Sequence, residues 1–213
     1  MSKTAFLAEQ WRQTCAALAL GGGEGQYRKL LRVWSGWGRH YHSVEHLIAC
    51  LQEFDRVRHL AAQQGEVEMA LWFHDAVYRT YRKDNEDRSA AWAARFLASR
   101  GAAPDVVLRV RDLVLATKHS GGELAGDAAL VVDVDLSILG QSPETYAEFE
   151  RNIRREYWWV PRRSYASARG RILEAFLAQP AIYHWPHFQE RYESTARANI
   201  ARAITALGFV SRS

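Results

Sequence analysis

The chain has 213 residues, of which 48% are hydrophobic and 24% are charged, and it contains only five prolines and two cysteines. These values are typical of a globular domain and exclude a disordered, collagen-like or disulfide-dense chain. No stretch approaches the roughly 18 apolar residues of a membrane span. We therefore expect residues 1–213 to form one cytoplasmic domain without a membrane partner, whose net charge of +4 suits an anionic ligand.

Apolar residues recur at helical spacing along the chain, which predicts an all-α fold, a single-domain helical bundle. The glycines at 21–23 end the first predicted helix, Gly101 and Pro104 mark a later boundary, and Ser43 is the expected N-cap of the third helix. Helices are expected at about residues 4–20, 26–34, 43–60, 66–78, 85–100, 106–118, 127–140, 143–158, 162–177 and 189–207.

The segment 127–140 is rich in β-branched residues, a composition that alone would favour a strand. No partner strands with turn signals occur elsewhere in the sequence. We therefore interpret this segment as a buried helix that carries two acidic residues, Asp133 and Asp135, and their burial requires an explanation.

A neutral base and a carboxylate, His74 and Asp75, stand side by side within the apolar stretch 69–78. The apolar residues around them cover most of a helix surface, which predicts a central helix at about 66–78. A buried charge is costly unless it is paired or coordinated, so this doublet indicates a metal site. Because adjacent helical residues point about 100° apart, other helices must supply the remaining ligands.

A histidine cluster at the start of the third predicted helix offers one of those ligands. His42 and His46 are four residues apart, so both can lie on one helix face if the helix begins early enough. Together with an acidic residue of the buried segment 127–140, the candidate ligands are His46, His74, Asp75 and Asp135.

This order of a histidine, a His-Asp doublet and a distant aspartate resembles the HD superfamily of metal-dependent phosphohydrolases. Residues 41–46 look like the Tyr-His-x-x-x-His segment of cyclic-nucleotide phosphodiesterases. Residues 135–137 look like their Asp-Leu-Ser ligand motif, which favours Asp135 over Asp133. The resemblance implies that His46 binds metal, that His42 gives a proton to the leaving oxygen, and that Asp75 can be shared by two ions.

The chain length and the segments 156–161 and 191–200 look most like a compact bacterial group of predicted HD phosphohydrolases. The resemblance covers essentially the whole chain. It implies a metal-site core at about 40–140 and a C-terminal helical extension at about 141–210.

The residue types suit the implied chemistry. A divalent ion supplies a nucleophile by acidifying bound water and neutralises the phosphoryl oxygens. Two imidazoles and two carboxylates favour Mn, Fe, Ni, Co or Zn over Mg alone, and one or two ions are both compatible with the set. The expected function is hydrolysis of a phosphomonoester, phosphoanhydride or phosphodiester bond in a small substrate such as a nucleotide.

Other polar residues have two interpretations each. Arg39, Lys83 and Lys118 are candidate contacts of the substrate phosphate, or solvated surface cations. His119 is a candidate for a second metal or for the phosphate, or a cap for helix carbonyls. Glu86, eleven residues after Asp75, is a candidate to orient the attacking water, as an acidic residue does in some relatives, or it simply favours the first turn of its helix.

Two alternative functions remain open on the sequence. Related HD proteins with additional histidine ligands hold two irons and perform oxygenation, and this chain offers one extra candidate, His119. The other alternative is a non-catalytic binding module for nucleotides or nucleic acid, based on the seven arginines between Arg151 and Arg171. Nucleic acid is the less favoured partner, and a homo-oligomer is compatible with the sequence.

Overall fold

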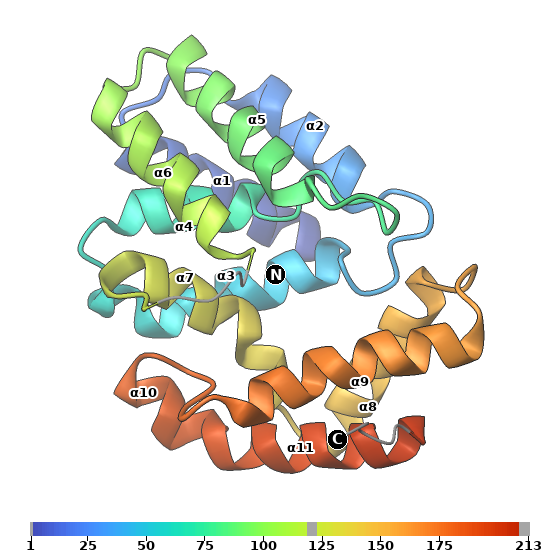
Figure 1. Cartoon of the computed structure of the whole chain (residues 1–213). Coiled ribbons are helices and arrows are strands. Elements are labelled where there is room, and N and C mark those ends of the chain that lie inside the picture. Colours follow the sequence, from blue (N-terminus) through green and yellow to red (C-terminus); the bar gives the residue numbers. More distant parts are fainter. Residues whose placement is uncertain (1, 119–122, 209–213) are drawn as a thin grey trace. The chain divides into compact units, whose positions relative to one another are not determined.

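The computed structural model describes residues 2–118 and 123–208, and every regular element within them is a helix. The predicted all-α fold is therefore confirmed (Figure 1). The chain divides into two compact units, Met1–Asp135 and Leu136–Ser213, which we call the N-terminal unit and the C-terminal unit. All four candidate metal ligands belong to the N-terminal unit.

The N-terminal unit begins with two helices that precede the histidine cluster. The predicted cap of the third helix is confirmed, because the Ser43 hydroxyl accepts a hydrogen bond from the backbone N–H of Glu45. The elements of this unit are α1 (Lys3–Ala17), α2 (Glu24–Trp34), α3 (Val44–Val57), η1 (Arg58–Leu60), α4 (Gln64–Phe73), α5 (Asn85–Ser99), α6 (Pro104–Ala116) and α7 (Gly126–Asp135).

Helix α4 is the centre of the N-terminal unit. It packs against α1, α3, α5, α6 and α7, and every residue from Gly65 to Phe73 is buried. The Trp72 indole donates a hydrogen bond to the Thr14 hydroxyl of α1 at 3.2 Å, and the Trp72 carbonyl accepts one from the Trp34 indole at 3.1 Å. These contacts place the C-terminal end of α4 in the interior of the unit.

The predicted extent of this helix was wrong, because α4 ends at Phe73 and not near residue 78. His74 is its C-cap, and residues 74–77 form a turn. Tertiary contacts take the hydrogen bonds that a longer helix would need: the Arg39 guanidinium binds the carbonyl of Ala76, and the backbone N–H of Val77 donates to the Ser89 hydroxyl. The His-Asp doublet therefore lies just beyond a central helix instead of within it.

The β-branched segment is helical, as predicted, but it is not one helix to residue 140: its first part forms α7, which ends at Asp135, and Leu136–Gly140 form the 3-10 helix η2. Residues 129–134 are all buried, and α7 packs against α3, α4 and α6, which explains why a sequence apolar on every face remains a helix. The carboxylate of Asp127 accepts hydrogen bonds from the backbone N–H groups of Ala62 and Gln63, each at 2.8 Å. Helix α7 ends at Asp135, so this side chain projects from a helix terminus.

The C-terminal unit is built on α11, which packs against α8, α9 and η2. The Asn199 amide on α11 donates to the carbonyls of Leu139 and Gln141 at 2.8 and 2.9 Å. The elements of this unit are η2 (Leu136–Gly140), α8 (Pro143–Glu156), α9 (Arg162–Ala178), α10 (Pro186–Phe188), η3 (Gln189–Glu193, a π-helical turn) and α11 (Ser194–Leu207).

Two of the seven clustered arginines in this unit have structural roles. Arg169 forms a shielded ion pair with Glu150 at 2.7 Å, and Arg154 donates to the carbonyls of Tyr157 and Val160. The remaining five arginines are exposed. Of the helices within residues 2–118 and 123–208, none combines the length and the apolar character needed to cross a bilayer.

Candidate metal centre

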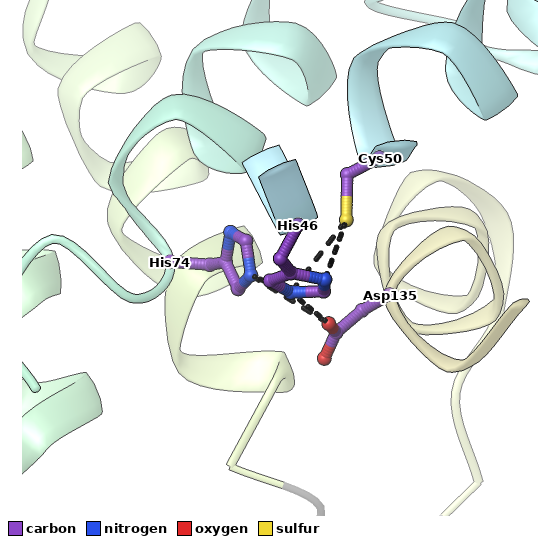
Figure 2. A group of neighbouring side chains, drawn as sticks. All are labelled: His46, Cys50, His74 and Asp135. Carbon is purple, nitrogen blue, oxygen red and sulfur yellow. Dashed lines mark hydrogen bonds and ion pairs between the residues drawn. The ribbon is translucent and has the colours of Figure 1, made fainter. Parts of the chain in front are cut away.

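Three elements of the N-terminal unit bring the candidate ligands together. His46 comes from the first turn of α3, His74 and Asp75 from the end of α4, and Asp135 from the end of α7. The Nε2 atoms of His46 and His74 are 3.0 Å apart. An oxygen of Asp135 lies 3.1 Å from Nε2 of His46 and 3.6 Å from Nε2 of His74, and Figure 2 shows the three side chains directed at one another.

Asp75 also lies beside the two imidazoles. Its Oδ2 atom lies 3.3 Å from Nε2 of His74 and 3.8 Å from Nε2 of His46. The two imidazoles are almost fully buried, whereas the side chains of Asp75 and Asp135 are 14% and 15% exposed. The cluster is therefore closed behind the histidines and accessible on the carboxylate side.

The tautomer of His74 is set by its backbone contact. Its Nδ1 atom lies 2.8 Å from the carbonyl oxygen of Leu71, and because a carbonyl only accepts, Nδ1 carries the hydrogen. Nε2 is then the ring nitrogen that faces the cluster. Metal-binding histidines commonly use their second ring nitrogen in this way.

The carboxylates control the charge of the two imidazoles. Burial lowers the pKa of His46, and the adjacent Asp135 carboxylate only partly offsets this. Burial also disfavours the charged form of His74, but Asp75 and Asp135 outweigh it and raise the pKa of His74 well above its ordinary value. In turn, His74 and His42 overcome the burial of Asp75 and lower its pKa. The two carboxylates thus stabilise a positive charge within the cluster.

The spacing of the donors fits a single transition-metal ion. Nitrogen and oxygen ligands bind such ions at about 2.0–2.2 Å, so two ligands of one ion are at most about 4.4 Å apart. The separations between donor atoms of His46, His74, Asp75 and Asp135 quoted above, from 3.0 to 3.8 Å, all satisfy this limit. The residues present therefore fit a bound divalent ion.

Cys50 is a further candidate ligand that the sequence reasoning did not select. Its Sγ atom lies 3.7 Å from both ring nitrogens of His46, and donor atoms of His46, Cys50, His74 and Asp135 all lie within 4.8 Å of one another (Figure 2). Burial, followed by the two aspartates, raises the pKa of the Cys50 thiol well above its usual range. The spacing of four residues from His46 on α3 was the available signal.

His42 lies beside the cluster and not on the helix that carries His46. It precedes the Ser43 cap, and its Nε2 atom is 4.0 Å from Oδ2 of Asp75. The His42 ring stacks on Tyr78, with centroids 3.9 Å apart and planes at 24°. The expectation that both histidines share one helix face is therefore replaced by a stacked ring at the helix entrance.

Arg39 supports the backbone on which the site is built. Its guanidinium donates to the carbonyls of His42 at 2.9 Å, Asp75 at 2.8 Å and Ala76 at 3.0 Å. It also lies over the Tyr78 ring at 5.7 Å. Arg39 is thus not a simple solvated surface cation, because it joins the histidine loop to the turn that carries the His-Asp doublet.

The remaining candidates lie outside the group of converging donors. Glu86 is in the first turn of α5 and Lys83 is exposed before that helix. Lys118 forms an exposed ion pair with Asp87 at 2.9 Å. His119 falls outside the described residues. Within the part of the chain that the structure describes, no contact joins Glu86, Lys83 or Lys118 to the four converging donors.

Comparisons with known proteins add no family assignment to this geometry: no protein-family model, no curated protein and no solved structure matches the chain.

Proposed function

We propose that this protein is a metal-dependent phosphohydrolase of the HD type that acts on a small phosphorylated substrate such as a nucleotide. The observation that supports the proposal is the convergence of four side chains from three separate helix ends. Donor atoms of His46, His74 and Asp135 are 3.0–3.6 Å apart, and Oδ2 of Asp75 lies 3.3 and 3.8 Å from Nε2 of His74 and His46. These four residues would hold one or two divalent ions, and Mn, Fe, Ni, Co or Zn suits the mixed nitrogen and oxygen donors better than Mg alone.

A bound ion at this place would supply an activated water and a Lewis acid for the phosphoryl group. The protein determines the side from which the substrate approaches the ion. Because the imidazoles of His46 and His74 are buried and the carboxylates of Asp75 and Asp135 are partly exposed, a phosphate ester reaches the site on the carboxylate side.

In the proposed reaction, His42 protonates the leaving oxygen. Its side chain is 18% exposed, its Nε2 atom lies 4.0 Å from Oδ2 of Asp75, and its ring stacks on Tyr78. A positioned histidine of this kind typically contributes about 10²–10⁴-fold to proton transfer. We therefore assign His42 the role of general acid within the proposed reaction.

The proposed enzyme is a cytoplasmic protein. Its two cysteines, Cys15 and Cys50, are both buried and free in the structure. Free thiols are typical of a reducing compartment.

Metal analysis combined with a substrate panel tests the proposal. The purified protein is expected to contain one or two divalent ions per chain and to hydrolyse at least one compound among nucleoside phosphates, cyclic nucleotides and pyrophosphate. His74→Ala and Asp75→Ala should each lose the metal, and activity should fall by more than the roughly 10–100-fold typical for loss of an outer-shell partner. His59→Ala changes an exposed histidine and should retain both.

Circular dichroism establishes that each variant is folded. Retention of both metal and hydrolysis in His74→Ala and Asp75→Ala would refute the proposal. A di-iron spectrum with consumption of O₂, and no hydrolysis of any panel compound, would replace it with the oxygenase alternative.

A further inference from the structure

A separate pocket lies in the N-terminal unit beside the metal centre. It has a volume of about 470 Å³, within the range of about 300–1,000 Å³ typical of small-molecule sites. Its walls come from the end of α2, the loop that follows it, the segment 76–79 after the His-Asp doublet, and one residue of α5. The candidate metal ligands are not part of its lining.

The charge of this pocket is entirely positive. Three arginines, Arg32, Arg39 and Arg79, belong to its lining, and none of the lining residues is acidic. Arg32 and Arg79 are exposed, and neither side chain forms an ion pair or hydrogen bond with any residue in 2–118 or 123–208. Two uncompensated guanidinium groups facing one cavity favour an anion with several oxygens, since the arginine fork matches phosphate geometry.

The same pocket is lined by three large aromatic residues, Trp37, Tyr78 and Trp92. Trp37 is 93% exposed, so its indole is accessible to a ligand. An aromatic ring that stacks on such side chains contributes substantial binding energy irrespective of its identity. A ligand that matches both the arginines and the aromatic side chains of the lining has an aromatic ring joined to phosphates.

The pocket and the metal centre share part of their walls. Tyr78 stacks on His42 with ring centroids 3.9 Å apart, and Arg39 binds the backbone carbonyls of Asp75 and Ala76. A ligand that contacts Tyr78 and Arg39 therefore lies against two residues that themselves contact His42, the proposed general acid.

We propose that this pocket binds a nucleoside polyphosphate, with the phosphates at Arg32 and Arg79 and the base against the aromatic side chains. The inference goes beyond the proposed function, because it concerns a binding pocket whose lining contains none of the candidate metal ligands. It does not require turnover, so the pocket can be tested in the absence of metal.

Binding is measured by quenching of tryptophan fluorescence and by calorimetry in excess EDTA. The probes are ATP, GTP, CTP and UTP, together with inorganic tripolyphosphate and adenosine. We expect at least one triphosphate to bind more tightly than tripolyphosphate or adenosine. Arg32→Ala and Arg79→Ala should each weaken binding of that triphosphate by about tenfold or more, since each removes charge-assisted hydrogen bonds. Trp37→Ala should weaken triphosphate binding but leave tripolyphosphate binding unchanged.

Arg163→Ala is the matched control, because it removes the same charge from an exposed arginine of α9, in the C-terminal unit. The affinity of Arg163→Ala for the triphosphate should stay within twofold of the affinity of the unchanged protein. Absence of nucleotide binding, or equal losses in Arg163→Ala and Arg79→Ala, overturns the inference. Metal-dependent hydrolysis without EDTA-resistant nucleotide binding would overturn the inference and leave the proposed function intact. Nucleotide binding without any hydrolysis would support the inference and contradict the proposed function.

Discussion

Nδ1 of His74 donates a hydrogen bond to the carbonyl oxygen of Leu71 at 2.8 Å, so the other ring nitrogen, Nε2, faces Nε2 of His46, 3.0 Å away. Two imidazole nitrogens and two carboxylates then meet in one small volume. Such a set of acceptors is stable only around a cation, which is a proton or a metal ion. This relationship links the fold of α4 to the proposed chemistry.

Removal of the metal should destabilise the protein. An ion present at 100 times its dissociation constant stabilises the native state by about 2.7 kcal/mol. For a chain of this size about 1 kcal/mol corresponds to roughly 2–4 °C in Tm, so excess EDTA should lower Tm by about 5–10 °C. Asp135→Asn should largely abolish this response, whereas Asp112→Asn, an exposed acid in α6, should keep it. Equal EDTA shifts in all three proteins would contradict the prediction.

Loss of the Arg39 guanidinium should destabilise the backbone segments that carry the candidate metal ligands. Arg39→Ala removes three hydrogen bonds to carbonyls, and Arg39→Lys cannot replace them, because one ammonium group does not reproduce the planar fork. We expect both variants to lose about 2 kcal/mol or more in the free energy of unfolding. Urea titration measures this loss. Arg32→Ala, which also removes an arginine but breaks no hydrogen bond or ion pair within the described residues, should change the value by less than about 0.5 kcal/mol.

Cys50 should be visible in the spectrum of a cobalt-substituted protein. A thiolate bound to Co²⁺ gives an intense charge-transfer absorption in the near ultraviolet that oxygen and nitrogen ligands do not give. We expect this band in the unchanged protein and its loss in Cys50→Ser, since donor atoms of Cys50 and three candidate ligands lie within 4.8 Å of one another. Cys15→Ser, which alters the other buried thiol, should retain the band. Identical spectra of the unchanged protein and Cys50→Ser would exclude Cys50 as a ligand.

Cys15 should lower the stability of the folded protein at alkaline pH. Burial raises the pKa of its thiol from 9.0 to about 11 in the native state, so the folded protein keeps a proton that the unfolded chain releases. The free energy of unfolding therefore falls as pH rises from about 9 to about 11, by at most about 2.7 kcal/mol from this residue. Cys15→Ala should show a shallower alkaline decline than the unchanged protein when urea unfolding is compared at pH 8 and 10.5. Parallel declines would refute the assignment.

The sequence predicted the helices well where local pattern decides structure. Segment 127–140 illustrates this, because the lack of any partner strand correctly outweighed its β-branched composition. The Ser43 cap was predicted for the same reason, since a capping hydroxyl bonds a backbone N–H only two or three residues away. The candidate ligands also came from the sequence, with Asp135 preferred over Asp133 because of the resemblance to the Asp-Leu-Ser motif, and their roles as ligands stay a prediction.

Only the tertiary structure decided where the central helix ends and what surrounds its end. Its last residue is Phe73, and Arg39, 34 positions earlier in the sequence, binds the carbonyls of Asp75 and Ala76 just beyond that end. The approach of Cys50 to the candidate ligands and the lining shared by Arg32, Trp37 and Arg79 likewise depend on packing between segments distant in sequence. Periodicity encodes which face of a helix is apolar, but it carries no information on which distant side chains meet at the ends of that helix.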